Sequence, residues 1–319
     1  GTHFLTVTFK ERLDDLMEQG IINQEQSLSY QAEHDRLLTT VVAPAYDKLA
    51  DEITLLKGNG KNIGGLAQYD GGRDYYLALL RLRTGSYRDI AEIKRILYQD
   101  LQFNYESLIH LLQADPALKD MILHKPMLLP ESTPEKYLSY LQTVIQEDYP
   151  AIPAGKDNAQ IHSMVKYVDP SLEPYSAPAF YMTPPIDNVS DNVIYINNQD
   201  TSGDLALFTT LAHEGYPGHL YQTVYSQRYW DEHEILPLQN VLYYGGFIEG
   251  WAMYVELASY DYAIQLAESA HPEAVRYYQA CRLNRQIHLC LYSLLDVSIH
   301  YDCASLEDVR IIFASLGTM

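Results

Sequence analysis

A proline–glycine pair interrupts a long helical pattern, and it stands between two histidines. Residues 204–231 have apolar side chains at helical spacing, yet they include the run HEGYPGH. On a regular helix, the six steps from His213 to His219 leave the two side chains roughly 120° apart, so the imidazoles cannot meet. Pro217 lacks the N–H that would continue the helical hydrogen bonding, and Gly218 tolerates conformations that other residues avoid. The sequence therefore predicts a bulge or a short unwinding at this pair.

Such a distortion would turn the run into a metal-binding motif. Zinc sites of the HExxH kind use two histidines to hold the metal, and the adjacent glutamate acts as general base on the bound water. By that reasoning His213 and His219 are candidate ligands, and Glu214 is the candidate base. The alternative is a helix that ends at 216–218, with two unrelated polar histidines. The run alone leaves both interpretations open.

A second motif, EGWAMYVE, supplies a candidate third ligand. Its first residue, Glu249, follows His219 by 30 residues and lies in another strongly helical stretch. Thermolysin-like zinc sites take one carboxylate in addition to two histidines. Glu249 has Ile248 and Trp251 nearby in the sequence, so we expect it to be partly buried, where a carboxylate needs a cation or hydrogen-bond donors. The alternative, an exposed glutamate on a helix, fits Glu256 better.

In this order, the two motifs resemble the bacterial domain-of-unknown-function family 885 (DUF885), which is grouped with the zincin metallopeptidases. Shorter stretches are similar to the family as well: AFYMTPP at 179–185, YIN at 195–197, DVSIH at 296–300 and, more weakly, DGGRDYY at 70–76. Two family features are missing, because Leu220 stands where a second histidine is common and no arginine comes shortly before Asp296. The family's last segment would lie beyond Met319, so we expect a fragment of a longer protein.

The resemblance implies a zinc-dependent peptidase. Zn²⁺ would be held by His213, His219 and Glu249, and Glu214 would take the proton of the bound water as a peptide bond is hydrolysed. The partner would be a peptide substrate. Two other functions stay open, namely a zinc hydrolase acting on another amide or ester and a peptide-binding protein without turnover. A hydrolysis assay separates the first from a peptidase, and metal content together with an intact base argues against the second.

Supporting roles are expected from residues around the motifs. His300 is the catalytic donor that the resemblance favours for the oxyanion, although a core histidine hydrogen-bonded to Asp296 fits equally well. Asp296 or Glu256 could orient a ligand histidine from the second shell. The strand over 193–197 is expected to be a sheet edge that pairs with extended substrate, with Asn197 at the contact. The remaining candidates are tyrosines for the oxyanion or substrate, Tyr243, Tyr244 and Tyr301, and arginines for a substrate carboxylate or for surface ion pairs, Arg282 and Arg285.

Hydrophobic periodicity and turn residues predict a mainly α-helical protein with a small antiparallel β-sheet, and the resemblance adds a zincin-like architecture of the gluzincin type. Strands are expected over 161–168, 179–182 and 193–197. Helices are expected over 8–56, 73–83, 86–113, 115–124, 133–147, 204–231, 237–266, 271–301 and 305–316. Proline and glycine near residue 150 separate a helical region, 1–150, from a region with the sheet and the metal-site helices, 151–319, within one continuous domain.

Composition excludes several other classes of protein. The formal net charge of −20, from 42 acidic and 22 basic residues, disfavours binding to nucleic acid. No stretch approaches the ~20 apolar residues that a membrane span needs, and the charged residues within 1–20 do not form a signal peptide. The location is therefore extracytoplasmic only if a preceding segment carries a signal, and cytoplasmic otherwise. The three cysteines form neither a zinc knuckle nor an evident disulfide framework. The oligomeric state stays open.

Overall fold

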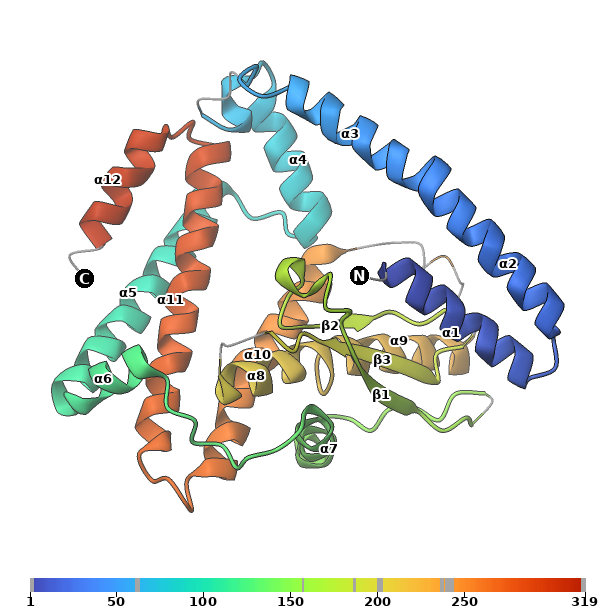
Figure 1. Ribbon diagram of the computed structural model, residues 1–319. Coiled ribbons are helices and arrows are strands. Elements are labelled where there is room, and N and C mark those ends of the chain that lie inside the picture. Colours follow the sequence, from blue (N-terminus) through green and yellow to red (C-terminus); the bar gives the residue numbers. More distant parts are fainter. Residues whose placement is uncertain are drawn as a thin grey trace. The chain divides into compact units, whose positions relative to one another are not determined.

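The computed structural model describes residues 3–60, 64–156, 158–185, 188–199, 203–235, 238 and 244–316, and it is mainly helical (Figure 1). The chain divides into two compact units. The first consists of Gly1–Asn62 with Asp169–Tyr175, and the second of Ile63–Val168 with Ser176–Met319. No helix in the described ranges is long and apolar enough to cross a membrane.

The first unit is a set of helices. They are α1 (Phe4–Glu18), α2 (Gln24–Leu37), the π-helical turn η1 (Leu38–Val42), α3 (Ala43–Leu55) and the short 3-10 turn η4 (Glu173–Tyr175). A turn after α1 divides the helical region predicted over 8–56. Asn23 starts α2, because its side chain accepts a hydrogen bond from the backbone N–H of Gln26, and the Gln26 side chain accepts one from Asn23 in return.

The second unit contains the sheet and the remaining helices. Its helical elements are η2 (Leu66–Gln68), α4 (Gly72–Thr84), α5 (Ile90–Ala114), α6 (Ala117–His124), α7 (Pro134–Val144), η3 (Ile145–Glu147), α8 (Asp204–Glu214), α9 (His219–Glu232), α10 (Gly245–Ala267), α11 (Ala274–His300) and α12 (Leu306–Leu316). These elements match the predicted helices, except that the region predicted over 204–231 forms two helices, α8 and α9. That division is the break predicted from the proline–glycine pair.

The sheet has three strands in the order β1-β3-β2, formed by β1 (His162–Tyr167), β2 (Ala179–Met182) and β3 (Asp191–Ile196). β2 pairs with β3 in antiparallel fashion, with Ala179 opposite Ile196, but β1 pairs with β3 in parallel. The sheet is therefore mixed, and the prediction of an antiparallel sheet was wrong. Strand direction depends on the long connection after β1, which local residue patterns do not encode. The prediction of an edge strand over 193–197 was also wrong, because β3 is the central strand and β2 lies at an edge.

The core of the second unit lies between the sheet and the helices behind it. Along β3 the side chains of Ile194 and Ile196 are buried, while those of Val193 and Tyr195 are partly exposed, as the two-residue period of a strand requires. They belong to the same buried cluster as Phe208 and Leu211 of α8, which are fully buried. This packing fixes α8 against the sheet, so the histidine-bearing end of α8 has a defined place.

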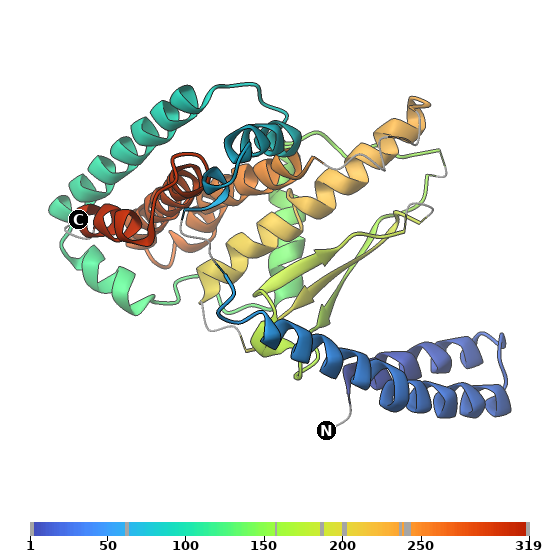
Figure 2. The ribbon, with the colours of Figure 1, turned by 90° about the horizontal axis from the view of Figure 1, so that it is seen from above.

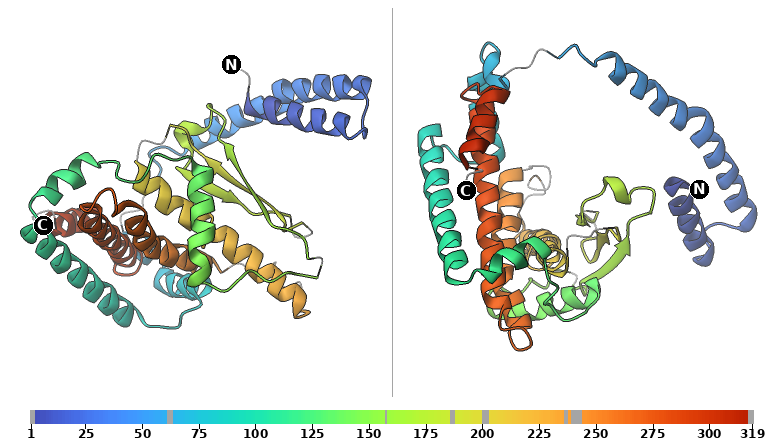
Figure 3. Two further views of the ribbon diagram at one scale, coloured as in Figure 1. Left: turned by 90° about the horizontal axis from the view of Figure 1, so that it is seen from below. Right: turned by 60° about the vertical axis from the view of Figure 1, so that its left-hand side comes forward.

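The helices of the second unit form successive layers on one side of the sheet. Figure 2 and the right-hand view of Figure 3 show the sheet first, then α8 and α10, then α11, with α5 on the far side. Contacts link the members of this series in turn: β2 with α8, α8 with α10, α10 with α11, and α11 with α5. The two motif-bearing helices, α8 and α10, are therefore neighbours at the centre of the unit.

Arg228 ties α9 to the segment that precedes β1. Although it is charged, its side chain is buried, with 6% exposed. The guanidinium donates hydrogen bonds to the backbone oxygens of Pro153, Ala154 and Ala159, at 3.3, 3.0 and 2.5 Å, and to the hydroxyl of Ser190. Because these carbonyl groups are satisfied by one side chain, Arg228 is a structural residue of the fold.

Replacing Arg228 should therefore destabilise the protein. We expect Arg228→Ala to lower the free energy of unfolding by about 3 kcal/mol, because it removes a buried side chain that bonds to three backbone carbonyl groups. Arg276 is the matched control, since it lies on the surface and pairs with Asp115 at 3.6 Å; its replacement by Ala should cost at most about 1 kcal/mol. Urea denaturation of the two variants measures the difference, and equal stabilities would contradict the assignment.

Candidate metal centre

The site begins at a break between two helices. α8 ends at Glu214 and α9 starts at His219, and the four residues between them are not helical. The peptide bond between Tyr216 and Pro217 is cis. The break takes the form of a short unwinding. The N–H of Tyr221 bonds to the carbonyl of Gly215 across it, at 3.2 Å, so that α9 starts in close contact with the end of α8.

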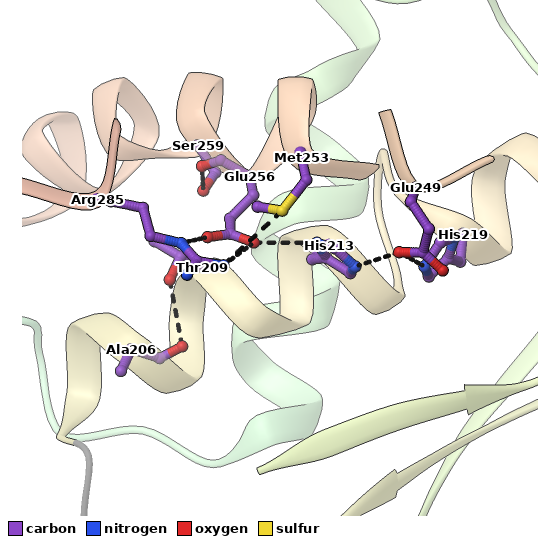
Figure 4. Close-up of polar contacts among 9 residues, drawn as sticks. All are labelled: Ala206, Thr209, His213, His219, Glu249, Met253, Glu256, Ser259 and Arg285. Carbon is purple, nitrogen blue, oxygen red and sulfur yellow. Dashed lines mark hydrogen bonds and ion pairs between the residues drawn. The ribbon is translucent and has the colours of Figure 1, made fainter. Parts of the chain in front are cut away.

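This break brings the two histidines together. The ring centroids of His213 and His219 lie 4.8 Å apart, with the ring planes at 85°. Glu249 on α10 approaches both, because its Oε2 lies 3.6 Å from each Nε2 (Figure 4). All three ligand atoms lie within 4.8 Å of one another. The described residues thus form a cluster that could hold a metal ion, from the three side chains that the sequence singled out.

Gly218 makes the close approach of the two helices possible. A Cβ atom at this position would lie 1.7 Å from the carbonyl oxygen of His213 and 2.4 Å from that of Ala212. These are backbone atoms, which cannot move aside as the end of a flexible side chain can. Only glycine therefore fits between the end of α8 and the start of α9.

The second motif holds the break in place. The indole Nε1 of Trp251 donates a hydrogen bond to the carbonyl oxygen of Pro217 at 2.8 Å. The indole packs edge-on against Tyr149 and stacks on Tyr221, with centroids 6.0 and 6.4 Å apart. Trp251 thus satisfies a carbonyl that the interrupted helix leaves free. We did not predict this role, although the position of Trp251 two residues after Glu249 was the available signal.

Glu256 lies on the opposite side of His213 from Glu249. Its Oε2 is 3.0 Å from Nδ1 of His213, and its Oε1 accepts a hydrogen bond from Nε of Arg285 at 2.7 Å. Figure 4 shows the resulting row of side chains, from His219 through Glu249, His213 and Glu256 to Arg285. A carboxylate on the second ring nitrogen fixes the orientation of a ligand histidine. Arg285, which comes from α11, was a candidate for a substrate carboxylate or a surface ion pair, but the structure pairs it with Glu256 beside His213.

The expected burial of the two glutamates is reversed. The side chain of Glu249 is 56% exposed and that of Glu256 is 9% exposed. Glu249 lies near the start of α10, where the helix borders an open pocket, whereas Glu256 lies two turns further on, where α10 packs against α8 and α11. The flanking apolar residues of Glu249 were therefore a poor guide to its exposure.

The charges around His213 follow from these contacts. Burial alone lowers the pKa of His213, but the hydrogen bond to Glu256 and the nearby carboxylates outweigh it and hold this pKa above its usual value. Burial alone raises the pKa of Glu256, but hydrogen bonds from His213 and Arg285 hold it below the usual value. Burial and the neighbouring His213 lower the pKa of His219. Glu256 is thus kept ionised, and His219 is kept in the neutral form that can bind a metal.

Glu214, the candidate base, is held by the sheet. Its Oε2 accepts a hydrogen bond from the backbone N–H of Tyr181 at 2.8 Å. Tyr181 belongs to the edge strand β2, so that a main-chain donor of the sheet fixes the carboxylate next to the two histidines. Burial raises the pKa of Glu214. We did not predict this contact, although Tyr181 lies in one of the stretches that resemble the family.

A pocket of about 620 Å³ opens over this cluster. It is bordered by β2, α9 and the start of α10. Its lining residues are Tyr181, Thr183, His213, Glu214, His219, Gln222, Thr223, Ser226, Gln227, Trp230, Tyr244, Phe247, Ile248 and Glu249. Tyr244, a predicted substrate-binding residue, is among them. Tyr243, the neighbouring candidate, lies outside the described residues.

His300 and Asp296 lie in a separate contact that does not line the pocket. Asp296 accepts a hydrogen bond from the hydroxyl of Tyr76 at 2.6 Å, and Nδ1 of His300 accepts one from the backbone N–H of Leu66 at 3.3 Å. Nε2 of His300 lies 3.9 Å from Asp296. These bonds join the end of α11 to η2 and α4. The structure therefore places both residues in a link between elements, and Asp296 does not contact a ligand histidine.

Two further candidates, Asn197 and Arg282, make contacts outside the pocket lining. Asn197 is buried, and its side-chain amide donates to the carbonyl of Ser176 at 3.1 Å, while its backbone N–H donates to Pro178 at 2.9 Å. It braces the end of β3 and does not line the pocket. The oxygens of Asp261 lie 3.1 and 3.3 Å from Arg282, in an exposed ion pair.

Comparison with known proteins identifies the family. The family model described as "Bacterial protein of unknown function (DUF885)" matches residues 4–311. The chain belongs to this family. No curated protein matches this DUF885 chain.

Among solved structures, a similar one is the crystal structure of a protein from Colwellia psychrerythraea that is described as a lipoprotein. The TM-score is 0.77 at 18% sequence identity, over 98% of this DUF885 chain and 54% of the other. The chain thus shares the fold of that protein and spans about half of its length.

The role of Gly218 in this DUF885 chain can be tested with two matched substitutions. Gly218→Ala should weaken metal binding by at least about tenfold, because its Cβ forces the two helices apart and separates the histidines. Gly250→Ala is the control, since a Cβ at Gly250 meets nothing within 4 Å although the residue is next to Glu249. Competition with a chelating dye measures both affinities. Unchanged binding by Gly218→Ala would show that the close approach is not required.

Glu256 can be tested in the same way. We expect Glu256→Ala to weaken metal binding by about 10–100-fold, because His213 loses the carboxylate that orients its ring. Asp261→Ala removes an acid from the same helix, but from its exposed ion pair with Arg282, and should leave the affinity unchanged. If both variants bind metal as tightly as the parent, Glu256 does not support the site.

Proposed function

We propose that this chain is a zinc-dependent peptidase in which Glu214 acts as general base. The observation that supports it most strongly is the convergence of His213, His219 and Glu249, with 3.6 Å from the Glu249 oxygen to each histidine nitrogen. Tetrahedral zinc with bonds of about 2.0–2.2 Å places neighbouring ligand atoms roughly 3.3–3.6 Å apart. Two imidazoles and one carboxylate are also the ligand set of catalytic zinc sites that keep a fourth position open. The two distances from Glu249 match that spacing, and all three ligand atoms lie within 4.8 Å of one another, so the residues present could hold the metal.

Glu214 has the surroundings of a proton carrier. When bound, zinc would polarise the substrate carbonyl and lower the pKa of a water molecule. The Glu214 carboxylate lines the same pocket, and the N–H of Tyr181 fixes its direction. A carboxyl group whose pKa is raised by burial is suited to accept a proton and to pass it on to the leaving amine.

The edge of the sheet supports a peptide as the substrate. Tyr181 belongs to β2 and Thr183 follows it, and both line the pocket together with the candidate metal ligands. An extended peptide can add to such an edge through main-chain hydrogen bonds. We propose that the substrate pairs with β2. β2 thus takes the role of the substrate-pairing edge strand that was expected for residues 193–197.

Tyr244 is the proposed donor to the oxyanion. Of the donors considered from the sequence, it alone among the described residues lines the pocket, and its side chain is accessible, with 46% of the residue exposed. A phenolic hydroxyl can donate a hydrogen bond to the charge that develops on the carbonyl oxygen. His300 is tied to Leu66 instead, so we assign it no part in the reaction.

The zincin-like architecture is part of the same proposal. Its support is the paired helices α8 and α10 beside a small sheet whose edge strand borders the metal cluster. A binding protein without turnover has no need of a base beside the first ligand, and this argues for an enzyme. A location outside the cytoplasm is proposed from the description of the Colwellia protein as a lipoprotein.

Two variants test the proposal together. Glu214→Gln should keep one zinc per chain and lose hydrolysis by about 10²–10⁴-fold, because it removes the base and leaves the ligands. His219→Ala should lose the zinc itself, since a ligand is missing. Elemental analysis and hydrolysis of a peptide library measure the two effects. Full activity of Glu214→Gln, or full zinc content of His219→Ala, would refute the assigned roles.

A further inference from the structure

The part of the chain that builds the pocket is almost free of strong bases. Between Lys166 and Arg276 the sequence contains one lysine or arginine, Arg228, and fifteen aspartates and glutamates. This segment includes β2, β3 and the helices α8, α9 and α10, which with Thr183 and Tyr244 at their ends supply the described lining of the pocket. The stretches of this segment that the structure does not describe also lack lysine and arginine. The described lining of the pocket therefore contains no lysine or arginine.

Two arginines that bond to elements around the pocket are already engaged. The guanidinium of Arg228 donates to backbone carbonyls of the segment that precedes β1, and the residue is 6% exposed. Arg285 bonds to Glu256, behind His213 (Figure 4). Neither belongs to the lining residues. The basic side chains of the described lining are the two ligand histidines, which a metal would occupy.

The wall opposite β2 is polar but uncharged. It is formed by one face of α9, with Gln222, Thr223, Ser226 and Gln227. The side-chain nitrogen of Gln222 and the side-chain oxygen of Gln227 are buried without a hydrogen-bond partner among the described residues. Each of these two amides carries both a donor and an acceptor, and these functions match the N–H and C=O of a peptide group or a carboxamide.

We infer that the site accepts internal, uncharged segments of peptide and excludes substrate carboxylates near the scissile bond. A carboxylate that enters the pocket loses its water and finds no cation besides the proposed metal, which the scissile peptide group needs, whereas neutral peptide groups find partners on β2 and α9. The site thus cleaves within a chain and does not act as a carboxypeptidase. This inference deepens the proposed peptidase function and rests on it for the position of the scissile bond.

The test compares peptides that differ by one charge. The reference is a peptide blocked at both ends with Asn next to the scissile bond; one twin carries Asp there, and a second ends in a free carboxylate one residue after that bond. We expect both twins to be hydrolysed at least about tenfold more slowly, because their carboxylates are desolvated without a partner. The assay is run at about 0.15 M salt, which screens the net charge of the protein beyond roughly 8 Å. Equal rates would overturn the inference.

A pair of charge-inserting variants makes the test specific to the pocket. Ser226→Lys places a cation on the α9 wall, and Ser293→Lys makes the same change on the exposed face of α11. Ser226→Lys should reduce the preference for the Asn peptide over the Asp peptide by about tenfold. The reason is that the new lysine can pair with the Asp carboxylate inside the pocket, away from water. Ser293→Lys should leave that preference unchanged. An unchanged preference in Ser226→Lys, or equal shifts in both variants, would overturn the inference.

Binding separates this inference from the peptidase proposal. The zinc-loaded Glu214→Gln variant lacks the base, so peptide binding can be measured without hydrolysis. Trp230 in the pocket lining provides the fluorescence signal. Weaker binding of the twins supports the inference even if the parent protein hydrolyses none of the peptides, and in that case only the peptidase proposal fails. Binding of the Asp peptide as tight as that of the Asn peptide overturns the inference, whatever the rates of hydrolysis are.

Discussion

The site depends on one close approach, between the start of α9 and the carbonyl of His213 at the end of α8. Gly218 permits that approach because it has no side chain. A Cβ atom at this position would lie 1.7 Å from the carbonyl oxygen of His213. The approach places His219 beside His213 although the two are six residues apart. A continuous helix would have separated them, and α10 would then meet a single histidine. The candidate metal site is therefore a consequence of how the backbone packs, and the chemistry of its ligands depends on that packing.

α10 connects this break to the rest of the core. Three residues of this one helix contact the site. Glu249 lies close to both histidines, and Trp251 bonds to the carbonyl of Pro217 in the break. Glu256 contacts Nδ1 of His213, on the other side of the ring from Glu249. Arg285 of α11 in turn holds Glu256. The site is thus fixed by packed helices on one side and by the edge strand β2, through its bond to Glu214, on the other. The three candidate ligands and Glu214 all lie on helices.

The sequence predicted the features that local rules control. The helices and the interruption at Pro217 and Gly218 follow from residue spacing and backbone chemistry. The spacing alone left the meeting of His213 and His219 open, and the second motif and the family resemblance favoured it. The features that were wrong depend on long-range packing. The direction of β1 relative to β3 follows from a long connection, and the exposure of Glu249 and Glu256 follows from which turn of α10 faces the pocket. Asn197 and His300 carry polar groups suited to catalysis, but the fold uses them to join elements.

The central claim is that His213, His219 and Glu249 bind one zinc ion together. The most direct measurement is anomalous diffraction on both sides of the zinc absorption edge, from crystals of protein shown by elemental analysis to contain zinc. One strong peak is expected, about 2.0–2.2 Å from a nitrogen of each histidine and from an oxygen of Glu249. A peak bound by other residues, or a straight helix through 212–222 with the two imidazoles on different faces, would contradict it.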